Sequence, residues 1–197
     1  MADVVVARVR AAPEALAETV ERLLDRTVTS AVADPLDVPD PDAACERVSE
    51  SWSAGPANPL GLVASWLTGR WATRTLRIGN RFSVPLAAVL TAVPPLALSF
   101  RRGVLELRVL ASFVVTRLRA EGIAVDPRVV QRLTVNTYCW PTLGADAARE
   151  RPAAVVRLAT QWVTRTVVPD DPGVRVRSAA RSIADLDLRA LSDRLER

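Results

Sequence analysis

The chain has 197 residues, a formal net charge of +4 and 49% hydrophobic residues, which suits one folded domain and excludes wholesale disorder. It contains no His and no Lys, so every basic side chain is an Arg. This excludes Ser-His and Cys-His dyads, an HExxH zinc site, a Schiff-base lysine and a Walker-type phosphate lysine. The mild charge permits an anionic partner without requiring one.

Two helices are predicted in residues 12–56, on either side of a proline-rich acidic loop. Residues 12–32 show helical periodicity, with Pro13 in the first turn. Prolines punctuate residues 34–42, and a short helix follows from Asp42 to Ser53. The short alternating runs Val4–Val9 and Val174–Val176 leave open a pair of strands.

The middle of the chain is dominated by the uncharged segment Phe82–Phe100. A helix from about residue 59 to Ile78 is expected before it, stopped at Gly79. Inside the segment, Pro94-Pro95 predicts two helical pieces joined at a bend. A helix resumes near Pro95 or Arg101 and runs to residue 120, and Gly122 ends it. Between residues 109 and 115 this helix is apolar nearly all round, which is typical of a central, covered helix.

The last third predicts further helices. Asp126 is a good N-cap with Pro127 at the first helical position, so a helix is expected over residues 127–138. Another is expected over residues 146–167, followed by a turn at 170–173 and by one or two amphipathic helices over 178–197. The fold class predicted is all-α, a single helical domain over 1–197, with N-terminal helices in 12–56, an apolar helical core in 57–140 and amphipathic helices in 141–197.

Three interpretations of Phe82–Phe100 stay open: a core hairpin, a membrane hairpin or a membrane span. Its length is near that of a bilayer core, and its apolar residues favour insertion by roughly 3–5 kcal/mol. Prolines in mid-helix cost up to about 3 kcal/mol each and can cancel this. Arginines on both flanks favour a hairpin with both ends on one side.

An arginine stripe precedes the segment. Arg70, Arg74, Arg77 and Arg81 recur at helical spacing, and Trp66 and Trp71 lie beside them. Arginine binds phosphate and tryptophan favours the headgroup boundary, so the pattern predicts contact with anionic lipid or with a partner; a solvated basic face is the alternative. The predicted contact residues are Trp66, Arg70, Trp71, Arg74, Arg77, Arg81, Arg101 and Arg102. Arg102 could also pair with Glu106 at the rim of its helix.

The order of these segments resembles the EcsC-like helical proteins and related small membrane-associated bacterial families. It is carried by GLVASWLTGRWATRTLRIGN, SVPLAAVLTAVPPLALSF, GVLELRVLASFVVTRLRAEGI and DPRVVQRLTVNTYCW, within residues 57–140. The resemblance implies an all-α, membrane-proximal protein and assigns no residue roles.

The remaining polar residues favour structural roles. The acids at 34, 37, 40 and 42 lack EF-hand spacing and fit turns and caps better than a metal, and Asp170-Asp171 precede a Pro-Gly turn. Cys45 and Cys139 belong to no CxxC motif, so buried free thiols are expected. We expect no catalytic, cofactor or metal residues.

The leading hypothesis is a non-enzymatic protein that contacts a membrane surface or a protein partner. The alternatives are a soluble helical interaction module or accessory subunit, and a carrier of apolar ligands. Residues 1–10 carry Asp3 and no signal-peptide pattern, so a cytoplasmic place is expected, including the inner face of the membrane. A nucleic-acid partner is not expected, and the oligomeric state is left open.

Overall fold

The structure is a computed structural model that describes residues 2–54, 75–78, 82–85, 94–140, 151–164 and 171–195. It confirms the all-α fold class. The helices are α1 (Ala2–Ala33), α2 (Pro41–Ala54), α5 (Pro94–Ala120), α6 (Pro127–Cys139), α7 (Arg151–Thr164), α8 (Pro172–Ala184) and α9 (Leu188–Leu195), and a small hairpin is formed by β1 (Thr75–Ile78) and β2 (Phe82–Pro85).

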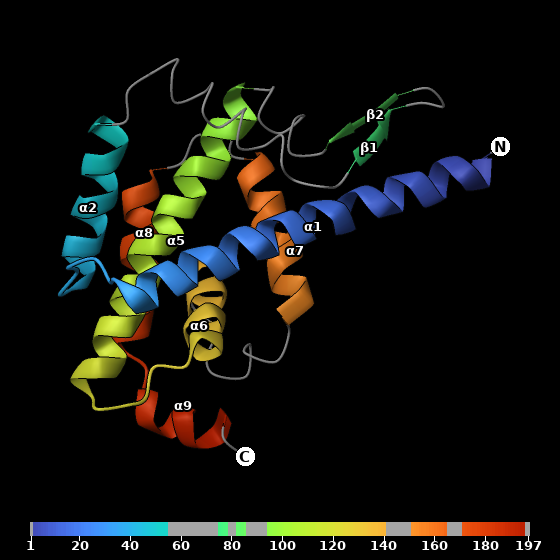
Figure 1. The fold of residues 1–197 in the computed structure, drawn as a ribbon. Coiled ribbons are helices and arrows are strands. Elements are labelled where there is room, and N and C mark those ends of the chain that lie inside the picture. The colour runs from blue at the N-terminus through green and yellow to red at the C-terminus, as the bar shows by residue number, and fades with distance from the viewer. Residues whose placement is uncertain are drawn as a thin grey trace.

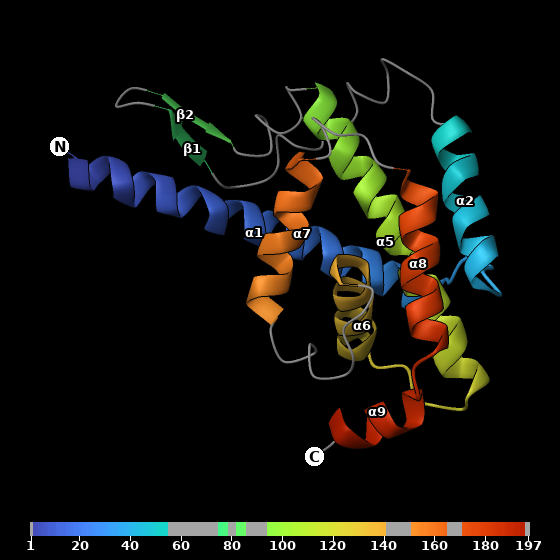
Figure 2. The ribbon, with the colours of Figure 1, turned by 180° about the vertical axis from the view of Figure 1, so that it is seen from behind.

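Helix α5 lies at the centre of the bundle and contacts α1, α2, α6, α7 and α8 (Figures 1 and 2). Every residue of the run 109–115 is buried, at 1% exposure or less. The predicted central helix is therefore confirmed: a helix that is apolar all round must be covered on all sides. Helices α2 and α8 also pack side by side, although they are far apart in sequence.

Local signals at the helix ends act as the sequence predicts. The Asp126 carboxylate accepts a hydrogen bond from the Arg128 backbone N–H at 2.7 Å, and Pro127 is the first residue of α6. Gly122 follows the last turn of α5 with φ +70°, a left-handed conformation that glycine adopts at little cost. Both cysteines are buried free thiols, as expected.

The hairpin corrects the prediction of helices at 75–78 and 82–85. Strand β1 pairs antiparallel with β2, with Leu76 opposite Val84 and Ile78 opposite Phe82. In both stretches apolar and polar residues alternate, and Gly79-Asn80 lies between them. Gly-Asn between alternating runs is a hairpin signal in the sequence, and the prediction of a helix over these stretches overlooked it.

The start of helix α5 lies where the sequence predicts it. The helix begins at Pro94 and continues unbroken to Ala120, which confirms a helix that resumes near Pro95. Proline suits that position because the first N–H groups of a helix have no intrahelical partner. The residues at 86–93, where the other piece was predicted, lie outside the described part.

The strands considered at Val4–Val9 and Val174–Val176 are wrong, because these residues lie in α1 and α8. Helix α8 begins at Pro172, where a turn was predicted, because Asp171 accepts a hydrogen bond from the Gly173 N–H at 2.9 Å and caps the helix. Of the helix predicted over 146–167, the structure describes Arg151–Thr164 as α7.

Close approach at Gly103 sets the distance between α5 and α7. A Cβ atom built at Gly103 would lie 2.3 Å from Cε2 of Trp162, which is fully buried. The Phe100 ring meets the same indole edge-on, with a centroid distance of 5.2 Å. Glycine is therefore required at 103 for the tryptophan to lie against the helix.

Replacing Gly103 with Ala should lower the free energy of unfolding by about 2 kcal/mol, because the extra carbon overpacks a filled core. Urea denaturation measures the loss. The loss should shrink in a Trp162→Phe background, whose smaller ring lacks the atoms that clash. An equal loss in both backgrounds would contradict the contact.

Candidate functional site

Most of the predicted contact residues lie outside the described part of the chain: Trp66, Arg70, Trp71, Arg74 and Arg81. Arg77 lies in β1, opposite Ser83. Because β1 spans residues 75–78, Arg77 cannot share one helix face with Arg70 and Arg74, and the prediction of a continuous helical arginine stripe is wrong at this point.

Arg101 and Arg102 lie near the start of α5 and face different surroundings. Arg101 is exposed, whereas Arg102 is half-buried and its guanidinium carbon lies 3.7 Å from the centroid of the Trp52 ring. A cation over an indole face at this distance is a cation–π contact. Trp52 belongs to the last turn of α2, so the contact joins the end of α2 to the start of α5 (Figure 1).

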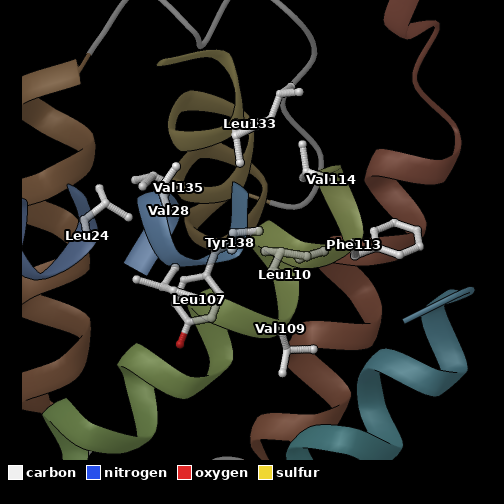
Figure 3. Close-up of a cluster of buried hydrophobic side chains, with 14 of the residues drawn as sticks. Leu24, Val28, Leu107, Val109, Leu110, Phe113, Val114, Leu133, Val135 and Tyr138 are labelled. Carbon is white, nitrogen blue, oxygen red and sulfur yellow. The ribbon is translucent and has the colours of Figure 1, made fainter. Parts of the chain in front are cut away.

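A buried carboxyl group lies one turn further along α5. Glu106 is fully buried, so the prediction that it lies at the rim with Arg102 is wrong. Its Oε2 accepts a hydrogen bond from the Tyr138 hydroxyl of α6. Figure 3 shows Tyr138 within the apolar cluster that also contains Leu107 and Leu110. A carboxyl group in such surroundings needs hydrogen bonds, because its desolvation is costly.

Helix α6 carries further polar side chains into the interior. The Thr137 hydroxyl donates to the Leu133 carbonyl one turn earlier, and the Gln131 amide donates to Asp25 of α1. The Thr134 hydroxyl is fully buried and has no hydrogen-bond partner among the described residues. These contacts are internal to the bundle, so they describe how α6 is held rather than an exposed site.

A crevice between α1, α6 and α7 is lined by Leu24, Gln131, Val135 and Val155, among others. Its volume is about 10 Å³. That is room for about one water molecule, whereas pockets for small organic ligands measure roughly 300–1,000 Å³. This crevice does not accommodate an apolar ligand.

The acids of the proline-rich loop serve the fold where the structure shows their contacts. Asp40 accepts a hydrogen bond from the Ala43 N–H at 2.7 Å and caps α2. Asp42 forms ion pairs with Arg177 and Arg181 of α8, at 2.9 and 3.5 Å. Within the described ranges no group of three or more Cys, Asp or Glu residues could hold a metal ion.

The sequence did not predict the Glu106–Tyr138 hydrogen bond or the Arg102–Trp52 contact. Glu106 is a lone acid in an otherwise apolar stretch, which is a signal for a buried partner, but nothing in the sequence points to Tyr138. Trp52 lies fifty residues from Arg102, and this pairing has no local signal either.

Comparison of the chain with protein-family models, with curated proteins and with solved structures gives no match. The EcsC-like resemblance of residues 57–140 therefore stays a prediction. Among the described helices, none is both long and apolar enough to cross a membrane.

Two substitutions in α6 that each remove a buried hydroxyl should have different effects on stability. Tyr138→Phe should lower the free energy of unfolding by about 1–3 kcal/mol, because Glu106 loses a hydrogen bond in the core. Thr134→Val should leave stability unchanged or raise it by up to about 1 kcal/mol, because no described bond is lost. Urea denaturation of both variants checks this, and equal losses would contradict the Tyr138–Glu106 bond.

Proposed function

We propose that this chain is a non-enzymatic helical protein that lies close to a membrane and contacts anionic lipid with the end of the bundle at which α5 begins. The observation that carries the proposal is the exposed Arg101, which directly follows the uncharged segment Phe82–Phe100. A cation beside apolar residues is the pattern of interfacial contact, because the cation meets phosphate and the apolar residues meet the acyl boundary.

The arrangement of α5 favours contact by its first turns only. Beyond Arg101 and Arg102 the helix enters the bundle, and its run 109–115 is covered by protein. The protein would then lie on a membrane surface instead of crossing it through α5. Since anionic lipids are enriched in the cytoplasmic leaflet, the inner face of the membrane is the place we propose. The EcsC-like resemblance implies the same setting.

A soluble interaction module is the second candidate. The complete cover of residues 109–115 favours it, because such a helix needs no lipid. Val174, in the first turn of α8, is 56% exposed and offers a small apolar contact for a protein partner. The carrier of apolar ligands has less support, and lipid co-purifying with the protein in mass spectrometry would revive it.

Vesicle flotation separates the candidates. The protein should float with vesicles that contain phosphatidylserine and not with pure phosphatidylcholine, and binding should weaken in about 1 M salt, where charges are screened within about 3 Å. Arg101→Ala should weaken binding roughly fivefold, since an arginine near an anionic surface contributes about 1 kcal/mol. Arg74→Ala combined with Arg77→Ala tests the predicted contact residues before Phe82–Phe100, and this double variant should also bind more weakly if those residues contact lipid.

The matched control is Arg128→Ala. It removes one exposed arginine and the same charge at the start of α6, which follows the opposite end of α5, so binding should not change. If the protein does not float at low salt, the membrane proposal is wrong and the soluble module takes its place. If Arg101→Ala and Arg128→Ala weaken binding equally, the contact is a general charge effect and not a site.

A further inference from the structure

We infer that Arg102 positions the start of α5 and does not contact lipid, so the adjacent arginines of the Arg101-Arg102 pair have different roles. The inference deepens the proposed function and rests on it. It follows from the surroundings of one helical turn, residues 100–103, in which three residues contact a neighbouring helix and Arg101 is exposed.

Two tryptophans from different helices hold this turn. Phe100 meets Trp162 of α7 edge-on at 5.2 Å, and Gly103 leaves the space that Trp162 fills. On another side of the helix, Arg102 lies over Trp52 of α2 at 3.7 Å. Consecutive helical residues lie about 100° apart around the axis, so a turn fixed on the sides of 100, 102 and 103 has one side left.

Arg101 lies on that remaining side and is exposed. Its direction is therefore determined by the contacts of its three neighbours with α2 and α7. Loss of the Arg102–Trp52 contact would release the side of the turn that faces α2 and would change where Arg101 points. Arg102 itself is half-buried against the indole and would have to leave it to reach a phosphate group.

Variants of Trp52 distinguish a positioning residue from a lipid contact. If Arg102 positions the turn, Arg102→Ala and Trp52→Leu should each weaken binding to phosphatidylserine vesicles by a similar factor of about three. The double variant should be no weaker than either single one. If Arg102 contacts lipid, Trp52→Leu frees its guanidinium and binding should stay or strengthen, which would overturn the inference.

The pair of Arg157 and Trp140 supplies a matched control. The Arg157 guanidinium carbon lies 4.2 Å from the Trp140 ring centroid, so this pair joins α7 to the residue that follows α6 and includes neither Trp52 nor α2. Trp140→Leu removes a similar cation–π contact and should leave vesicle binding unchanged. A loss of binding equal to that of Trp52→Leu would show a general effect of destabilisation and would overturn the positioning role.

A second measurement separates failure of this inference from failure of the proposed function. In urea unfolding, a double-mutant cycle of Arg102→Ala and Trp52→Leu should show coupling of about fivefold in the unfolding constant, whether or not the protein binds vesicles. If the wild-type protein does not float but the coupling is present, the proposed function fails, while the positioning of residues 100–103 by the Arg102–Trp52 contact stands. If the two substitutions act independently, the positioning role of Arg102 is wrong.

Discussion

The bundle depends on covering one helix from all sides. The run 109–115 of α5 offers apolar surface in every direction, and complete burial of one such side chain contributes about 1.5–3 kcal/mol relative to exposure. No single neighbour can cover a cylinder, so α5 contacts five other helices, which come from both ends of the sequence. Part of this cover comes late in the chain. Helix α8, which packs against α2 and α5, begins more than a hundred residues after α2 ends, so the core is complete only when these distant segments meet.

The same burial makes the polar side chains within the core specific. Apolar surface can be buried in more than one packing arrangement, whereas a buried carboxyl group tolerates few arrangements. Glu106 is bonded to Tyr138, and this bond favours one rotation of α5 relative to α6. The close approach of Gly103 to Trp162 restricts α5 relative to α7 in the same way. Shape and hydrogen bonding thus select one packing among those that burial alone would allow.

The sequence predicted what local chemistry decides. The cap at Asp126, the stop at Gly122 and the buried run 109–115 each depend on neighbouring residues, and the structure confirms them. Where two local signals competed, the prediction failed: residues 75–85 fit a helix that ends at Gly79, and they also fit strands that alternate around Gly79-Asn80. The contact of Arg102 with Trp52 could not be predicted, because it depends on how α2 meets α5, and no local pattern encodes that distance.

The structure also gives different surroundings to the arginines near the uncharged segment. In the sequence, the arginines around the uncharged segment look like one basic surface, and each would add about 1 kcal/mol to lipid contact. The Arg102 guanidinium instead packs on the Trp52 indole ring, and Arg77 lies in a strand and not on the predicted helix face. Under the proposed lipid contact, fewer cations would be directed at one surface, and electrostatic attraction alone would then give weak, reversible and salt-sensitive binding. Firm attachment would then depend on apolar residues beside Arg101, so the direction in which the first turn of α5 points decides whether they and the arginine reach the surface together.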